Sequence, residues 1–357
     1  MAKKAVKLPK KPARSRRGQI TIVDVARVAG VSKSTVSLFL QDSKLIKEET
    51  KQAIREASEQ LGYVYNRSAA RLRKASSDFI GVVIGDQTNP FFAELAAGIE
   101  EVLLQRQLLP VIANAHEDAK HQVSVIKALR EHGVAGIILS PARGTTGWLL
   151  AEALPKTLPT VIAMCPVEDC PFPYVGPDNV GGVYVSTKHL IDLGHKSIAY
   201  LGGDASYSAH RERLKGWRKA LEEAHLPVDA RLIFESAPTR TGGAEAVEVA
   251  LASAVKPTAA VCFNDLVALG ASKELAKKGL IVGRDFALIG FDDIPEAAHS
   301  SPALSTVSVE TKEMGRLAAK RLLQIIDKEK SVPGNYLGDA KLIVRASSAP
   351  PKKTKLD

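Results

Sequence analysis

The first regular pattern of apolar residues is a short helical one, in the stretch TIVDVARVAG that starts at Thr21. Its apolar positions recur three and four residues apart, on one helix face: Ile22, Val25, Ala26 and Ala29. Thr21 is a suitable N-cap, and Asp24 stands where the acidic partner of a capping box belongs. Gly30 ends this helix, because glycine takes the positive φ of a C-terminal cap at little cost.

A second and a third helix follow. Ser32 can cap the second, in which Val36 and Leu40 face one side, and Phe39 is expected beside them. The third is predicted from Glu48 to Leu61, where Gly62 stops it; its apolar stripe consists of Ala53, Ile54, Ala57 and Leu61. A helix, a short turn containing glycine and a second helix make the helix-turn-helix motif. The alternative is a small helical bundle with no ligand.

From Phe79 onward the pattern changes to short apolar strands that alternate with helices. The strand-like runs are FIGVVIG, LLPVIAN, VAGIILS, TVIAMC, SIAYLGG, RLIFES, AAVCFN and FALIGFDD, with KLIVRASS as a late strand. Helices are predicted at 91–107, 121–132, 182–193, 215–224, 242–254, 265–278 and 312–327. The alternation is typical of doubly wound parallel sheets with helices on both faces. Because so many strands do not suit one sheet, we expect two α/β subdomains, the second beginning near GPDNVGG.

Polar and aromatic residues collect where several predicted strands end. They are Asp86, Asn89, Phe91, Phe92, Arg211, Arg213, Asn264, Asp265, Asp292 and Asp293. Such sheets bind ligands at the carboxyl ends of their strands. Carboxylate, amide and guanidinium groups bind hydroxyls and aromatic rings stack on a sugar face, so the set predicts a site for a polyol or sugar. A lone aspartate at a strand end is more often a helix N-cap, and that alternative stays open for Asp265.

The charge of the chain is concentrated in its first part. The net charge is +10, yet residues 1–77 hold 18 Lys and Arg against 6 Asp and Glu, and the remainder holds 31 against 33. A basic head on a neutral body indicates a polyanion-binding module. The face formed by Lys33, Ser34 and Ser37 points away from the apolar face of its helix, which also favours DNA binding. A solubilising tail is the alternative, and it accounts only for residues 1–19.

Composition excludes several other classes of protein. No apolar segment follows the basic N-terminus, so we expect no secretory signal, and no apolar run has the length of a membrane span. The three cysteines, Cys165, Cys170 and Cys262, lack metal-ligand spacing and suit a reducing cytoplasm. We therefore expect a cytoplasmic protein without metal or cofactor.

The segment from Tyr65 to Lys74 differs from its neighbours because it has almost no apolar face. Asn66 can cap a short helix in which Leu72 is the one large apolar residue, between Arg71 and Arg73. A helix this short is unstable alone. A single leucine among arginines fits a helix that folds on DNA and inserts the leucine into the minor groove. A polar linker is the alternative.

The phrases TIVDVARVAGVSKSTVS, LGYVYNRSAARL and FIGVVI resemble the lactose-repressor (LacI/GalR) family from Thr21 to Ser348. The resemblance implies an α-helical helix-turn-helix headpiece, a hinge helix, and an α/β core of two doubly wound, periplasmic-binding-protein-like subdomains. It also implies a homodimer on a palindromic operator in double-stranded DNA. Two positions depart from the family: Leu38 stands where many members carry arginine, and Lys47 where a serine caps the third helix. Short phrases such as TVSLFL point to the maltose-regulon repressor branch.

The resemblance assigns roles by position. The implied DNA contacts are Thr21, Ser32, Lys33, Ser34, Thr35, Ser37, Leu38, Asn66, Ala69, Leu72 and Arg73. The implied effector contacts are Arg213, Asn264, Asp292 and Phe92, with Asp86 and Asn89 as lesser contacts, and the strand-end argument adds Arg211 and Asp265. Lys33 can reach a guanine edge and Leu38 only a thymine methyl, whereas Ser32 and Thr35 suit phosphates. A helix so poor in donors should discriminate weakly, so we expect Leu72 to contribute more to operator preference than Leu38.

Domain boundaries follow from the same reading. We expect a disordered basic arm at 1–19, a headpiece at 20–64, a hinge helix and linker at 65–77, a core at 78–348 and a disordered tail at 349–357. Within the core, the N-subdomain is expected at about 78–177 and 305–330 and the C-subdomain at about 178–304 and 331–348, joined by three crossing strands.

Two other functions compete with an effector-controlled repressor or an activator of the same family. A solute receptor would use the body alone, but the basic head argues against it. An enzyme is disfavoured because GPDNVGG lacks both nucleotide-loop patterns and the sequence contains no H-E-x-x-H or nucleophile elbow. No residue is assigned a catalytic role, and His195 in LGHKSIAY is expected to be a structural turn residue.

Overall fold

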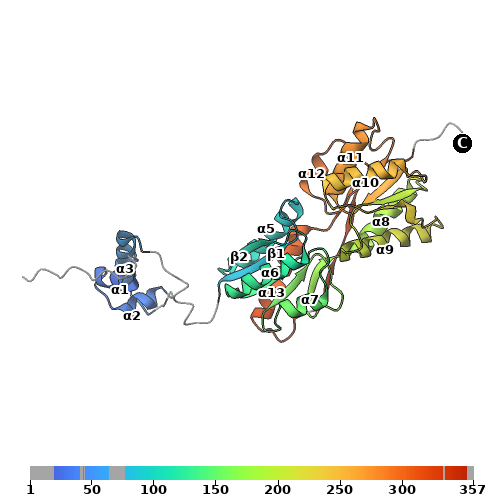
Figure 1. The fold of residues 1–357 in the computed structure, drawn as a ribbon. Coiled ribbons are helices and arrows are strands. Elements are labelled where there is room, and N and C mark those ends of the chain that lie inside the picture. Colours follow the sequence, from blue (N-terminus) through green and yellow to red (C-terminus); the bar gives the residue numbers. More distant parts are fainter. Residues whose placement is uncertain (1–19, 41–42, 44, 64–76, 333, 352–357) are drawn as a thin grey trace, which may run out of the picture. The chain divides into compact units, whose positions relative to one another are not determined.

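The computed structural model describes residues 20–40, 43, 45–63, 77–332 and 334–351. The chain divides into two compact units, Met1–Ser76 and Ser77–Asp357. We call residues 20–63 the headpiece and residues 77–351 the core, and we describe each by itself (Figure 1). The expected basic arm, the hinge helix and the end of the tail from 352 lie outside the described residues.

The headpiece consists of α1 (Ile22–Val28), α2 (Lys33–Phe39) and α3 (Glu48–Leu61). Its buried centre contains Val25, Ala26, Val36, Ile54 and Ala57. Phe39 and Leu40 pack against this centre, as the apolar pattern predicts. Gly30 and Gly62 have positive φ of 67° and 63° and follow α1 and α3, where the sequence predicts helix ends.

The helix starts in the headpiece differ in how they are capped. Thr21 and Asp24 form a capping box in which both the backbone N–H and the hydroxyl of Thr21 donate to Asp24 Oδ2, at 3.0 and 2.8 Å. Lys47 gives α3 no side-chain cap. Glu48 and Glu49 in the first turn of α3 offset this loss, because carboxylates are favourable near the positive end of the helix dipole.

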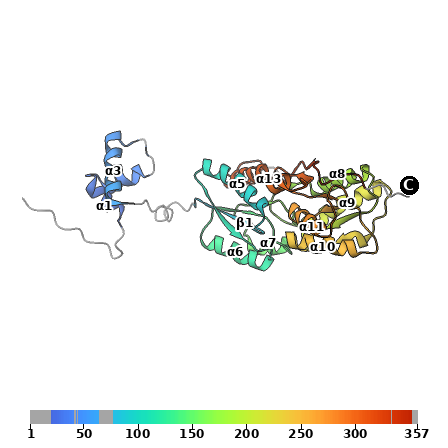
Figure 2. The ribbon, with the colours of Figure 1, turned by 90° about the horizontal axis from the view of Figure 1, so that it is seen from above.

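The first subdomain of the core is a parallel six-stranded sheet in the order β11-β5-β4-β3-β1-β2. Its strands are β1 (Phe79–Ile84), β2 (Leu109–Asn114), β3 (Gly136–Leu139), β4 (Thr160–Ala163), β5 (Tyr174–Pro177) and β11 (Tyr336–Gly338). Its helices are α5 (Pro90–Gln105), α6 (Ala119–Glu131), α7 (Gly147–Ala153) and α13 (Thr311–Ile326). Figure 2 shows α5 and α13 on one face of this sheet and α6 and α7 on the other. Gly98 and Gly315 allow α5 and α13 to approach closely, since a Cβ at Gly98 would overlap the Lys312 carbonyl.

The second subdomain is built on a parallel four-stranded sheet in the order β7-β6-β8-β9. Its strands are β6 (Ile198–Leu201), β7 (Ile233–Phe234), β8 (Ala259–Cys262) and β9 (Ala287–Ile289). Its helices are α8 (Asn179–Asp192), α9 (Ser208–Glu223), α10 (Arg240–Ala252), α11 (Asp265–Lys277) and α12 (Pro295–His299), with a 3₁₀ turn at Ala230–Leu232. α8 and α9 pack together on one face, and α10 and α11 on the other (Figure 2).

The antiparallel pair β10 (Thr306–Ser308) and β12 (Lys341–Ile343) lies beside the second sheet, because Asp292 bridges to Ser308. The chain passes between the subdomains after β5, between β10 and α13, and between β11 and β12. Two expected boundaries are therefore wrong. Residues 306–308 belong with the second subdomain, and β11 belongs to the first sheet. Such short strands carry no pattern that shows which sheet edge they pair with.

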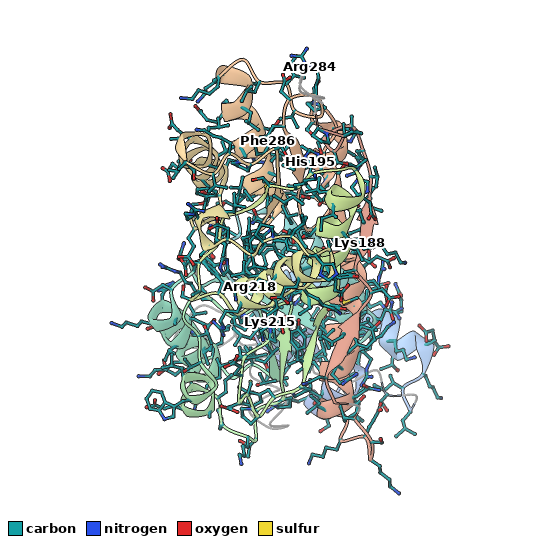
Figure 3. The ribbon with its side chains drawn as sticks, turned by 90° about the vertical axis from the view of Figure 1, so that its right-hand side faces the viewer. Lys188, His195, Lys215, Arg218, Arg284 and Phe286 are labelled. Atoms are coloured by element: carbon teal, nitrogen blue, oxygen red, sulfur yellow. The ribbon has the colours of Figure 1, made fainter. Side chains whose placement is uncertain are left out.

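The expected disorder from residue 349 is also wrong at its start. His195 Nε2 pairs with the Ala349 carbonyl oxygen at 2.8 Å, and His195 Nδ1 with the Thr258 hydroxyl at 2.8 Å. His195 is buried at the end of α8 (Figure 3) and holds this part of the chain in place. Its predicted structural role is therefore confirmed.

Candidate functional site

The first candidate site is the exposed face of α2 in the headpiece. Lys33, Ser34 and Leu38 are exposed, Ser37 is half-buried, and the neighbouring Val36 is fully buried. Burial of Val36 fixes the rotation of α2, so the predicted reading face is the face that solvent reaches. The side chain of Leu38 is 40% exposed although it is apolar.

The two predicted phosphate contacts at the start of α2, Ser32 and Thr35, are hydrogen-bonded to each other. Ser32 Oγ accepts the Thr35 backbone N–H at 3.0 Å and lies 2.8 Å from the Thr35 hydroxyl. Each hydroxyl keeps spare hydrogen-bonding capacity at the helix N-terminus, where anions bind favourably. The other predicted contacts, Asn66, Ala69, Leu72 and Arg73, lie outside the described residues.

The second candidate site is a cavity of about 370 Å³ in the core. It lies at the carboxyl ends of strands from both sheets, and its lining residues are Asp86, Asn89, Phe91, Phe92, His116, Glu117, Ser140, Pro141, Met164, Cys165, Tyr207, Ala209, Arg213, Ala237, Pro238, Thr239, Phe263, Asn264 and Asp292. Six predicted effector contacts are among them: Asp86, Asn89, Phe92, Arg213, Asn264 and Asp292. The structure therefore brings together residues as far apart in the sequence as Asp86 and Asp292, as the strand-end argument requires.

Two predicted effector contacts do not reach the cavity. Arg211 is two residues before Arg213 on α9, so it faces another side of the helix, and its Nη1 donates to the Ala205 carbonyl at 2.7 Å. Asp265 is fully buried behind the cavity wall, where it accepts the Ile294 N–H at 2.9 Å and the Thr306 hydroxyl. Burial raises the pKa of Asp265 well above its ordinary value. These contacts give Asp265 a structural role. It is not the N-cap of α11, as the alternative interpretation proposed, because that position is Asn264.

Arg213 is the buried guanidinium of the cavity. Its Nε donates to Asn179 Oδ1 at 2.9 Å, its Nη1 donates to the Phe263 carbonyl, and its Nη2 lies 3.7 Å from Asp292 Oδ1. The guanidinium also stacks 3.7 Å from the centre of the Phe291 ring. These contacts fix its position before any ligand binds, which is the usual basis of a preorganised site.

Asp292 faces Arg213 and has an unusual backbone conformation and an unusual pKa. Its φ is +115°, a conformation in which only glycine is unstrained. Burial raises the pKa of Asp292 to about 7, although Arg213 opposes the shift. Strained backbone and a displaced pKa together are typical of functional residues.

Asn89 and Asn264 cap two of the helices that begin at the cavity, α5 and α11. Asn89 Oδ1 accepts the Phe91 N–H at 3.1 Å, and Asn264 Oδ1 accepts the Val267 N–H at 2.9 Å. Asn264 Nδ2 donates to the Pro238 carbonyl at 3.1 Å. Both side chains therefore position helix termini as well as line the cavity.

Glu117 is a lining residue that the sequence analysis missed. It follows β2, has φ of +51°, and its backbone N–H donates to the Gly85 carbonyl at 3.0 Å. Its Oε2 accepts the Arg143 backbone N–H at 3.1 Å. Burial raises the pKa of Glu117 to about 7, and the nearby Asp86 carboxylate adds to the shift.

A polar bridge joins the subdomains beside the cavity. Arg143, after β3, pairs with Asp204 Oδ2 at 2.9 Å, and its Nε donates to Ser206 Oγ at 2.7 Å. The Gly144 N–H donates to the Ser206 carbonyl at 3.1 Å. We call this contact the latch. It lines a second hollow that shares Tyr207 and Ala237 with the cavity.

Six of the missed lining residues have a common origin. His116 and Glu117 follow β2, Ser140 and Pro141 follow β3, and Met164 and Cys165 follow β4. The strands were predicted, so the same strand-end rule applied to AHED, SPARG and MCP would have found them. Among the described residues no cluster of His, Cys, Asp or Glu is arranged to hold a metal ion. No helix of the described ranges is long and apolar enough to span a membrane.

Comparisons with known proteins cover most of the chain. A family profile described as "Bacterial regulatory proteins, lacI family" matches residues 21–66, and one described as "Periplasmic binding protein-like domain" matches residues 187–348. The Maltose regulon regulatory protein MalI of Escherichia coli is 32% identical over 334 residues, which is 91% of this chain and 98% of that protein. The chain belongs to the lacI family of bacterial regulatory proteins.

Other lacI-family members are similarly close. The Ribose operon repressor of Haemophilus influenzae is 32% identical over 306 residues, 86% of this chain and 92% of that protein. Equal identity to a maltose and a ribose regulator means that overall identity does not separate the branches. The lac repressor dimer bound to operator and the anti-inducer ONPF has a TM-score of 0.83 at 26% identity, covering 93% and 99% of the two chains. Membership confirms the predicted helix-turn-helix domain and the periplasmic-binding-protein-like core, and these relatives are regulators, not enzymes.

Proposed function

We propose that this lacI-family chain is a transcriptional repressor that binds a palindromic operator as a homodimer and responds to a sugar-like effector in the core cavity. The observation that carries the proposal is that one chain has both an exposed polar helix face on α2 and a cavity in which apolar walls from two sheets carry several polar groups. The first suits a DNA groove and the second suits a small solute.

DNA binding rests on the side chains presented by α2. Lys33 and Ser34 open the helix and are exposed, so they meet a major groove first. Leu38 would contact a thymine methyl, and Ser32 and Thr35 the phosphates. The Thr21 hydroxyl is committed to Asp24, so its predicted DNA contact would use its spare acceptor capacity.

Homodimer formation is supported by the edge of the first sheet. β2 is an edge strand of this sheet, and three of its apolar side chains are exposed: Leu109, Val111 and Ile112. Leu104, on the neighbouring helix α5, is also exposed. Exposed edge strands with apolar side chains pair or aggregate unless they are covered. A second copy of the chain would cover this edge and supply the second recognition helix that a palindrome requires.

A sugar-like effector is supported by the mixture of groups around the cavity. Phe92 and Phe263 offer ring faces, and Asp86, Asn89 and Asp292 offer hydrogen-bonding groups. The relatives named above are regulators of ribose and maltose genes by name. Such a repressor acts where the DNA is, in the bacterial cytoplasm.

The DNA claim is tested by footprinting the full chain on the region upstream of its own gene. We expect protection of an inverted repeat, with half-sites about one helical turn apart, and a dimer by sedimentation on that DNA. Protection without dyad symmetry would contradict the homodimer. Transcription from the protected promoter distinguishes repressor from activator.

The effector claim is tested by thermal shift of the full chain against a panel of sugars and nucleobases. A sugar that raises the melting temperature and changes operator affinity supports the proposal. Sugar binding in a chain that never binds DNA specifically would favour the solute receptor.

A further inference from the structure

The ionisable side chains of the cavity are unequally divided between acids and bases. Three carboxyl groups line the described wall, those of Asp86, Glu117 and Asp292, whereas Arg213 is the one Lys or Arg among the lining residues. Arg213 lies against Asp292, so Asp86 and Glu117 have no matching cation on the wall.

The positive groups near the cavity are already bound to the protein. All three guanidinium nitrogens of Arg213 face protein oxygens, those of Asn179, Phe263 and Asp292. The Arg143 guanidinium is held by Asp204 and Ser206 in the latch. An anionic group that reached Arg213 would also lie beside the Asp292 carboxyl group.

Most helix N-termini at the cavity are already capped. α5, α10 and α11 donate free N–H groups to their own cap residues, Asn89, Thr239 and Asn264, with which an anion would have to compete. α9 has no side-chain cap, but its N-cap Tyr207 lies near the carboxyl groups of Glu117 and Asp204, so an anion there would meet two acidic groups.

Asp86 and Glu117 occupy the neighbouring ends of β1 and β2. These strands pair in register up to Ile84 and Asn114, and the Glu117 N–H donates to Gly85, the residue before Asp86. The Glu117 carboxyl lies over Gly85, since a Cβ at that position would overlap Oε1. Its Oε2 is held by the Arg143 N–H, so the group keeps its place in the wall.

We infer that the effector carries no negative charge, and that a hydroxyl or amine of the effector donates to the Asp86 and Glu117 carboxyl groups. This inference rests on the proposed effector function of the cavity. A phosphate or carboxylate beside two acidic groups in a buried site is repelled, and like charges in contact cost several kcal/mol, whereas a donor to a buried carboxylate forms a strong charge-assisted hydrogen bond. The effector class is therefore a neutral or amino sugar, and phosphorylated sugars and sugar acids are excluded.

The test uses matched ligands on the full chain. Each sugar of the panel is compared with its 2-amino derivative, its 6-phosphate and its aldonic acid by thermal shift and calorimetry. We expect a neutral or amino sugar to bind and its phosphate and acid to bind at least tenfold more weakly. Tighter binding of any phosphate or acid than of its parent sugar overturns the inference, as does a panel in which no neutral or amino sugar binds.

The variant Glu117→Gln locates the interaction. Glutamine keeps the size of the side chain and an acceptor for the Arg143 N–H, so the apo melting curve serves as a check on folding. We expect the affinity for the best sugar to fall roughly ten- to hundredfold, the range for a hydrogen bond to a charged group. Glu152→Gln, an exposed site on α7, is the matched control and should change nothing. Equal affinities for Glu117→Gln and the parent chain would overturn the assignment.

The pH dependence gives an independent readout. The pKa of Glu117 is about 7, so its ionised fraction rises between pH 6 and 8. A donor ligand should therefore bind more tightly as pH rises, by up to roughly tenfold, and an anionic ligand less tightly. The charged or titratable groups facing Glu117 are Asp86, Arg143, Cys165 and Tyr207. Glu117→Gln should reduce the slope, which leaves only the part due to Asp292; an unchanged slope would contradict the inference.

Failure of this inference is separable from failure of the proposed function. If a sugar phosphate releases the chain from its operator, the repressor function is supported and the inference of an uncharged effector is contradicted. If a neutral sugar binds but no operator is protected, the inference about charge is supported and the repressor function is contradicted.

Discussion

The headpiece and the core cavity place functional side chains in opposite environments. On α2 the candidate contacts are close together in sequence, exposed or half-buried, and supported by five buried apolar residues. In the cavity they come from strand ends far apart in the chain, and Arg213 and Asp292 are nine-tenths buried. A surface that binds DNA needs exposed hydrogen-bond donors, which can exchange water for DNA atoms. A cavity for a small solute needs groups whose positions are fixed before the solute arrives.

Arg213 should give the largest effect in the core. Arg213→Ala leaves Asp292 and Asn179 without their partner, which costs about 3–5 kcal/mol for a broken buried pair. We expect effector binding to be abolished in calorimetry. Arg211→Ala is the matched control, because Arg211 lies two residues away and does not reach the cavity. Loss of effector binding in Arg211→Ala would contradict the geometry.

Ile54 should give the largest effect in the headpiece. Its side chain is fully buried in a small centre, so Ile54→Ala should cost about 2–5 kcal/mol and abolish operator binding in a gel shift. Trp148 and Trp217 both lie in the core, so the melting transition seen by tryptophan fluorescence should stay where it is. Val23→Ala, at an exposed site on α1, is the control. A shifted tryptophan transition would show that the two units do not unfold independently.

The two regions should respond oppositely to pH. The pKa of Asp24 is lowered, chiefly by the backbone N–H of Thr21, so its stabilisation is present above its unfolded pKa and is lost as pH falls through the lower folded value. Burial raises the pKa of Glu117 and Asp292 to about 7, so their stabilisation is present below an unfolded value of about 4 and is lost as pH rises through 7.

The core should therefore melt at a lower temperature at pH 8 than at pH 5, with a change on the order of a few kcal/mol, as followed by tryptophan fluorescence. Asp292→Asn should flatten this dependence. A core that becomes more stable from pH 5 to pH 8 would contradict the burial argument.

The sequence predicts that Leu72 contributes more to the preference for operator DNA than Leu38 on α2 does. Leu72→Ala should reduce the preference for operator over random DNA by about 1–3 kcal/mol, since a wedge that unstacks a base step is worth a few kcal/mol. Leu38→Ala should cost less, because it removes only a methyl contact. Competitive titration at fixed salt measures both, and the reverse ranking would show that α2 discriminates better than its composition suggests.

The latch should have the smallest effect. The Arg143 and Asp204 side chains are 54% and 24% exposed, so their pair is worth about 0.2–1 kcal/mol. Asp204→Asn should speed effector release up to about fivefold, less at high salt, in stopped-flow measurements. Asp192→Asn breaks a comparable exposed pair with Lys188 on α8 and is the control. Equal release rates in the two variants would assign the latch no role in closure.

The sequence predicted the headpiece better than the cavity, for physical reasons. Glu48–Leu61 has the predicted bounds because the acidic first turn, the apolar stripe and the terminating Gly62 are local signals. Six cavity residues were predicted because strand ends converge in parallel sheets. Arg211 and Asp265 do not line the cavity, because the direction of a side chain depends on the rotation of its helix and on packing from distant segments. Glu117 follows a predicted strand, so the strand-end rule would have placed the AHED turn at the cavity. Which residue of that turn faces the cavity is set by the positive φ of His116 and Glu117, and no local pattern shows this.

The central claim is that the cavity controls the headpiece. It is tested most directly by titrating the full chain onto its footprinted operator, with and without a saturating sugar that calorimetry has identified. We expect the sugar to change the operator affinity by at least about fivefold, the lower end of allosteric coupling, and to have no effect in Arg213→Ala. An unchanged operator affinity in the parent chain with the sugar fully bound would contradict the account.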